Sequence, residues 1–118
     1  MRRVLLGGLL ASLLLALPAS VAAGSSITHS PDSPTTVTGV FFTVTTGGGN
    51  CEFASVSVSC TVGTSVVYST ILTVSVPPKG TGTSATIYPP AGSCVADLVK
   101  LMSIGKARVL ATTSFTVQ

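Results

Sequence analysis

The chain has 118 residues, of which 46% are hydrophobic and only 8% are charged, with a formal net charge of +3. Two of its six basic residues, Arg2 and Arg3, precede an apolar run from Val4 to Leu17. The part of the chain after this run has four basic and three acidic residues, a net charge of +1. This near-neutrality excludes the basic surface that binding to nucleic acid or anionic lipid requires.

The N-terminal segment has the three-part layout of a secretory signal peptide. Pro18 ends the apolar run, and Val21-Ala22-Ala23 supplies the small residues of a cleavage site. The run is shorter than the ~20 apolar residues that cross a bilayer, and no second run of this kind follows. We therefore expect residues 1–23 to be removed, with cleavage after Ala23 or, alternatively, Ala22. Residues 24–118 are expected to be secreted, without a membrane span, into an oxidising compartment.

The remaining 95 residues predict one all-β domain. Val, Ile, Thr and aromatic residues alternate with Ser and Thr, and clusters of Gly or Pro separate the runs. Segment 66–76 predicts either two short strands or one bent strand. The other expected strands, in chain order, are 25–28, 36–45, 53–62, 83–88 and 106–117.

Alternation within these strands predicts which side chains face the core. The strongest pattern, in 53–62, places alternate residues inside: Ala54, Val56, Val58, Cys60 and Val62. In the second strand, Val40, Phe42 and Val44 lie on one face and Phe41 lies on the other. In the last strand, one face carries Val109, Ala111, Phe115 and Val117.

Segment 93–105 is compatible with two structures. As a helix it has Ser93 as N-cap, Gly105 at the C-terminal end and an apolar stripe that includes Leu98. As a strand it pairs with residues 108–117 through a turn near 103–106. We favour the strand, because every neighbouring segment is β and a lone helix would have to cover a sheet face.

About seven short strands in a chain of this length predict an immunoglobulin-like antiparallel β-sandwich. The segments ITHSP (27–31), VFFTV (40–44), LTVSVPP (72–78) and SFTV (114–117) resemble those of single immunoglobulin-like domains in exported bacterial and fungal proteins. These include Ser/Thr-rich fungal proteins similar to the N-terminal domain of the yeast cell-wall β-glucan assembly family. The resemblance covers the whole of residues 24–118 and implies a role at the cell surface or wall.

Three cysteines follow the signal peptide, and an exported domain usually pairs two of them. If 53–60 is one strand, Cys51 and Cys60 lie about 25–30 Å apart at ~3.3 Å per residue, too far for a disulfide. In the expected sandwich the third strand runs antiparallel to the sixth, so that the end of one lies near the start of the other. We therefore expect a disulfide between Cys60 and Cys94.

Cys51 is then left in the loop that follows Gly47-Gly48-Gly49. Its simplest interpretation is an unpaired thiol, and the alternative is self-association or attachment through an intermolecular disulfide. A catalytic thiol is disfavoured, because the single His29 is distant in sequence and no Lys or Arg adjoins Cys51.

The remaining polar residues do not predict an active site. His29 lies beside a turn and is expected to be a solvated surface residue, and its lack of ligand-type neighbours argues against a metal site. The three acids, Asp32, Glu52 and Asp97, have no local reason to meet as a catalytic pair. We expect Asp97 to pair with Lys100 or Arg108. The chain is therefore predicted to have no catalytic residues, no metal and no cofactor.

Three aromatic residues are candidates for contact with a ligand. The chain has no Trp, so Tyr68, Tyr88 and Phe41 are the side chains expected to stack on a sugar ring. Core packing or scattered surface positions are the alternative interpretation of the same residues.

Composition and resemblance together indicate a non-enzymatic structural or binding module of the cell surface, cell wall or extracellular matrix, with a wall polysaccharide as partner. The alternative is a small secreted factor that binds an extracellular protein, such as a host-interaction factor or an inhibitor. Partners are expected on loops 46–52, 79–84 and 103–106, or as a strand added to an exposed sheet edge.

Overall fold

The computed structural model describes residues 24–101 and 105–118, so the expected signal peptide lies outside the described residues. The described part of the chain is all-β. Its strands are β1 (Ser26–Ser30), β2 (Phe41–Thr45), β3 (Glu52–Val62), β4 (Ser65–Val76), β5 (Gly82–Thr83), β6 (Gly92–Leu101) and β7 (Ala107–Val117).

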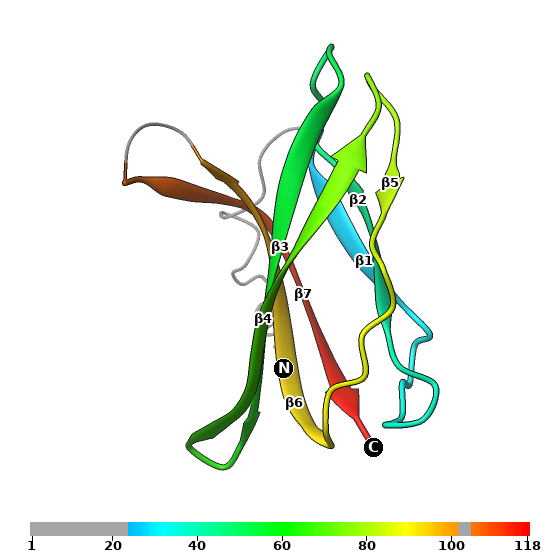
Figure 1. The fold of residues 1–118 in the computed structure, drawn as a ribbon, viewed down its shortest axis with the longest axis vertical. Helices are drawn as coiled ribbons and strands as arrows, with labels where there is room; N and C mark the ends of the chain where they lie inside the picture. The colour runs from blue at the N-terminus through cyan, green and yellow to red at the C-terminus, as the bar shows by residue number, and fades with distance from the viewer. Residues whose placement is uncertain (1–23, 102–104) are drawn as a thin grey trace, which may run out of the picture.

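The strands form two antiparallel sheets that enclose one core (Figure 1). The smaller sheet has the order β1-β2-β5, and the larger has the order β4-β3-β6-β7. Apolar side chains from both sheets meet between them, and the rings of Phe42 and Phe115 lie 5.7 Å apart across this interior. The arrangement is sandwich-like, because each sheet buries one face and exposes the other.

The predicted alternation accounts for most of this core. In β3 the even-numbered residues Ala54 to Cys60 are buried, and in β2 Phe42 and Val44 are fully buried, as is Val40 just before it. Segment 66–76 lies within one continuous strand, β4. The segment from Gly92 to Leu101 is a strand rather than a helix, as favoured from the sequence.

Two predicted strands are shorter than expected. The strand expected over 36–45 begins only at Phe41, because Thr35 holds the preceding residues in a turn. Its Oγ1 accepts hydrogen bonds from the N–H groups of Val37 (3.2 Å) and Thr38 (3.1 Å), and its carbonyl accepts the N–H of Gly39 at 3.0 Å. A threonine side chain thus replaces a strand partner for these backbone groups.

The strand expected over 83–88 is reduced to β5, Gly82–Thr83, because Ser84 interrupts the ladder. The buried Oγ of Ser84 accepts the N–H of Phe42 at 2.9 Å, a bond that a backbone carbonyl would otherwise make. The chain returns to β2 only at Ile87, which forms an isolated antiparallel bridge with Val40.

Irregularities in strand pairing make two of the predicted core positions wrong. Between β6 and β7, Leu98 lies opposite Ala111 but Val99 lies opposite Val109, so Leu110 is an extra residue. Leu110 therefore points inward and is 6% exposed, whereas Val109, predicted to be inside, is 41% exposed. Val62 was also predicted inside but is exposed, because a second irregularity follows Cys60 and the tip of the β3–β4 hairpin extends beyond the smaller sheet (Figure 1).

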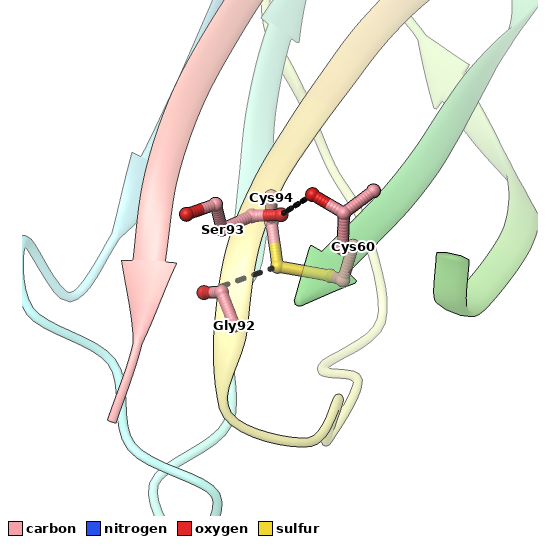
Figure 2. Close-up of a disulfide and its surroundings, with 5 residues drawn as sticks. Cys60, Gly92, Ser93 and Cys94 are labelled. Atoms are coloured by element: carbon pink, nitrogen blue, oxygen red, sulfur yellow. Dashed lines mark hydrogen bonds between the residues drawn. A yellow bond between two sulfur atoms is a disulfide. The ribbon is translucent and has the colours of Figure 1, made fainter. Parts of the chain in front are cut away.

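The disulfide joins Cys60 of β3 to Cys94 of β6, the pairing expected from the sequence (Figure 2). The two residues lie directly opposite each other on adjacent strands, with their Cα atoms 4.0 Å apart. Both are buried in the core, so the bridge fixes the register of the two central strands of the larger sheet.

Replacing both bridged cysteines with Ala is expected to lower the free energy of unfolding by about 2–5 kcal/mol. The bridged residues are 34 positions apart in the chain. Removal of the bridge raises the conformational entropy of the unfolded chain and leaves a gap in the core. Urea unfolding followed by circular dichroism measures the change. Cys51→Ala, which removes an exposed thiol, is the control and should change stability by less than about 0.5 kcal/mol; an equal loss in both variants would contradict the prediction.

Ser84→Ala is expected to destabilise the domain by about 1–3 kcal/mol, because the buried N–H of Phe42 loses its acceptor. The same unfolding measurement applies. Ser114→Ala, on the exposed side of β7, is the matched control and should be close to neutral. Equal stability of the two variants would show that the Ser84 hydroxyl is dispensable.

Candidate functional site

The outer face of the smaller sheet gathers hydroxyl groups in a regular array. Thr28 of β1 lies opposite Thr43 of β2, which in turn lies opposite Thr83 of β5, so that one threonine row crosses all three strands. On one side of this row Ser26 lies opposite Thr45, and on the other side Ser30 lies opposite Phe41. We call this surface the threonine face: Ser26, Thr28, Ser30, Phe41, Thr43, Thr45 and Thr83.

Burial of the opposite side chains explains why these residues point outward. Ile27 of β1 and Phe42 and Val44 of β2 are buried against the larger sheet. Because side chains alternate along a strand, a slip of one residue would expose these three and bury the threonines. The core therefore fixes the order of hydroxyl groups on the outside.

An exposed tyrosine extends the threonine face beyond Phe41. The Val40–Ile87 bridge, with N–H···O distances of 2.9 Å in both directions, places Tyr88 across from Gly39. A methyl group added to Gly39 would collide with the carbonyl of Ile87, with the methyl of Thr86 and with Cδ1 of the Tyr88 ring, so the ring lies against the glycine. Tyr88 is 61% exposed. Phe41 follows the buried Val40 in the chain, points to the same outer side as Tyr88 and is half-buried.

The three aromatic residues predicted to contact a ligand thus do not share one site. Tyr88 and Phe41 lie on the outer face of the smaller sheet. Tyr68 lies on β4 of the larger sheet, opposite Cys60, and is partly buried against the core. A substitution of Tyr68 would therefore affect the packing of the core before it affected a ligand.

Phe53 is an exposed aromatic residue that the sequence reasoning did not select. It lies on the outer side of the larger sheet, opposite Ser75, and is 78% exposed. Its odd number in a strand whose even residues are buried was the signal available, since it predicts an outward side chain.

The chemistry of the threonine face suits a neutral ligand rich in hydroxyl groups. Each Ser or Thr hydroxyl both donates and accepts hydrogen bonds. Phe41 and Tyr88 add apolar ring area at one end, and Tyr88 also carries a polar hydroxyl. None of the residues that define the face is charged. A sugar ring, with polar hydroxyl groups and apolar C–H faces, matches this combination.

Two of the loops expected to bind partners lie together at one end of the molecule (Figure 1). The N–H of Lys79 donates to the carbonyl of Gly48 at 2.9 Å. Glu52 accepts a hydrogen bond from Thr46 Oγ1 at 2.8 Å and pairs with Lys100 Nζ at 3.6 Å. Glu52 therefore anchors the glycine-rich loop to the larger sheet. In the third expected loop, residues 102–104 lie outside the described residues.

Two polar residues differ from their predicted environment. The expected ion pair of Asp97 with Lys100 or Arg108 is wrong. Lys100 reaches Glu52 instead, and Asp97 accepts a hydrogen bond from Thr112 Oγ1 at 2.7 Å. His29, expected to be solvated, is half-buried between the sheets: its Nδ1 lies 3.0 Å from Thr113 Oγ1 and its ring 5.0 Å from that of Phe115. The alternation of β1 turns His29 to the same side as the buried Ile27.

Within residues 24–101 and 105–118, no three His, Cys, Asp or Glu side chains lie close enough together to hold a metal ion. The same residues contain no helix long and apolar enough to cross a membrane. Comparison with protein families, curated proteins and solved structures gives no significant match to this chain.

Gly39→Ala is expected to destabilise the domain and displace Tyr88. Gly39 has φ 69°, which costs an alanine about 1–2 kcal/mol, and the collision with Ile87 and Tyr88 adds about 1–3 kcal/mol. Gly63→Ala is the matched control, because Gly63 has φ 63° but no neighbour within 4 Å of an added methyl. Urea unfolding should show the larger loss at Gly39, and equal losses would mean that the close approach of residues 86–88 to Gly39 does not affect stability.

Proposed function

We propose that this chain is an exported, non-enzymatic immunoglobulin-like module that binds a neutral polysaccharide at the cell surface, cell wall or extracellular matrix. The signal-peptide layout of residues 1–23 and the buried Cys60–Cys94 disulfide support export to an oxidising compartment.

The order of the strands supports the immunoglobulin-like classification. Lettered along the chain, β1, β2 and β5 correspond to strands A, B and E, and β3, β6 and β7 to C, F and G, which are neighbours in that fold. The remaining strand, β4, pairs with β3, which is the place of strand C′ rather than of strand D. The disulfide differs from that of antibody domains, because it joins two strands of one sheet rather than bridging the two sheets.

The observation that carries the proposal is the threonine face. An uncharged row of three threonines crosses the smaller sheet, and Phe41 and Tyr88 lie at one end of the same surface. The face lies on regular strands whose register is fixed by the core, so the hydroxyl groups are held in place before a ligand arrives. Such preorganisation reduces the entropy lost on binding.

A second candidate function, binding of an extracellular protein, is favoured by a different surface. Phe53 and Leu101 leave large apolar side chains exposed on the larger sheet. Aromatic side chains are enriched in the cores of protein–protein interfaces. The two functions use opposite sides of the domain and can therefore be tested separately.

Co-sedimentation with insoluble polysaccharides tests the proposal. We expect the exported protein to be retained on one neutral polymer, such as a β-glucan or chitin, at both low and high salt, because the face is uncharged. Tyr88→Ala should weaken retention about tenfold, since loss of one stacked ring costs about 1–1.5 kcal/mol. Thr43→Val, which removes the central hydroxyl of the row while keeping its shape, should also weaken it.

Phe53→Ala is the control, because it removes an exposed ring, 78% against 61% for Tyr88, from the other sheet. Retention lost in Phe53→Ala but kept in Tyr88→Ala would place the ligand on the larger sheet and contradict the proposal. A protein that stays in the supernatant with every polymer would favour the protein-binding alternative.

A further inference from the structure

Strand β4 forms an edge of the larger sheet, and its middle part lacks the residues that usually protect an edge against pairing. Among the described strands of that sheet, β4 pairs only with β3 (Figure 1). Its twelve residues, SVVYSTILTVSV, include no charged residue, no Pro and no Gly. Edge strands normally use charged residues and Pro to prevent pairing with another chain.

The disulfide shows which backbone groups of β4 face outward. Cα atoms 4.0 Å apart identify Cys60 and Cys94 as a non-hydrogen-bonded pair of β3 and β6. Cys60 therefore bonds to β4 on its other side, at Tyr68. Because the pattern alternates, Thr70 and Leu72 also bond to β3, whereas Ser69, Ile71 and Thr73 direct their N–H and C=O groups away from the sheet.

The position of Gly82 agrees with this assignment and limits the free edge. A methyl group added to Gly82 would collide with the carbonyl of Ser75, the next odd-numbered residue, so β5 covers that end of β4. At the other end, the pairing irregularity between Cys60 and Thr61 disturbs the first residues of the strand. The regular, unpaired part of the edge is therefore residues 68–73.

The opposite edge of the sheet is better protected. At the end of β7, Gln118 donates to the carbonyl of Pro34 and accepts from the N–H of Thr36, both at 3.1 Å. The start of β7 carries the charged Arg108, and Lys106 precedes it. These features leave β4 as the favourable edge for addition of a strand.

We propose that β4 pairs antiparallel with β4 of a second copy of this chain, about a two-fold axis at Ile71. Ile71 would then lie opposite Ile71 of the partner subunit, and Ser69 opposite Thr73 of the partner subunit. All three residues have outward-facing backbone groups, so each pair can form two hydrogen bonds. The side chain of Ile71, 70% exposed in the single chain, would gain an apolar neighbour.

A second copy fits this edge better than an unrelated charged segment. A two-fold axis makes any edge complementary to itself, provided that no like charges meet across it. Residues 68–73 carry no charge, and residues 24–118 carry a net charge of only +1, so repulsion between copies is small. Pairing would join the two larger sheets into one continuous sheet.

Sedimentation velocity over a wide concentration series tests the proposal. The chain is expressed from Met1 with Cys51→Ser, so that no intermolecular disulfide can form, and is purified as the exported product. We expect a dimer that dissociates on dilution. Ile71→Lys should abolish it, because two lysines would face each other at the axis. Phe53→Lys, at a similarly exposed position on β3, should leave it intact.

Amide hydrogen exchange identifies the interface directly. The N–H groups of Thr70 and Leu72 should be protected at all concentrations, because they bond to β3. Those of Ser69, Ile71 and Thr73 should become protected only as the dimer forms. Ile71→Pro, which removes an outward-facing N–H at an edge, should fold and remain monomeric.

Three results would overturn the proposal. The first is a monomer at every concentration, and the second is a dimer lost in Phe53→Lys but kept in Ile71→Lys, which would place the interface on the sheet face. The third is exchange at Ser69, Ile71 and Thr73 that does not depend on concentration. These outcomes are independent of polysaccharide retention, which is measured through Tyr88 on the other sheet.

Discussion

The pairing of β3 with β6 is the constraint on which the rest of the domain depends. β3 is bonded on both sides, and the Cys60–Cys94 disulfide fixes its register against β6. That register decides which even-numbered side chains enter the core and which backbone groups of β4 face solvent. A shift of one residue would reverse every face of the larger sheet. The bridge thus stabilises one alignment among several that a repetitive Val/Ser sequence would otherwise allow.

The same two-residue period produces both the core and the polar surface. In β2, burial of Phe42 and Val44 leaves Phe41, Thr43 and Thr45 on the outside, and β1 repeats this pattern. With few charged residues in the chain, the outward positions of β1 and β2 are filled mostly by Ser and Thr. A row of threonines is therefore the expected product of a β-sheet with this composition, and the addition of Phe41 and Tyr88 at one end is what distinguishes this face from other hydroxyl-bearing surfaces of the chain.

The features that depend on alternation were predictable from the sequence, and those in which a single residue interrupts the alternation were not. The core positions of β3 from Ala54 to Cys60, the strand at 92–101 and the Cys60–Cys94 pair followed from period and antiparallel order. The turn at Thr35 and the break at Ser84 depend on side-chain hydroxyl groups that replace backbone partners, and Leu110 is an inserted residue. The alternation of apolar and polar residues in the sequence does not reveal such side-chain hydrogen bonds or an inserted residue. Likewise, the common face of Phe41 and Tyr88 depends on one bridge between Val40 and Ile87, which lie 47 positions apart in the chain.

The threonine face and the β4 edge belong to different sheets, so the two proposed contacts are compatible in one molecule. A polysaccharide presents the same sugar many times, whereas one small face makes few contacts with it. Two copies joined through β4 would carry two threonine faces, and binding of the first would hold the second near the same polymer. The effective concentration of the second face would then be set by the rigid continuous sheet rather than by diffusion. Weak stacking by Tyr88 would in this way suffice for retention on a wall, without a larger aromatic surface in either copy.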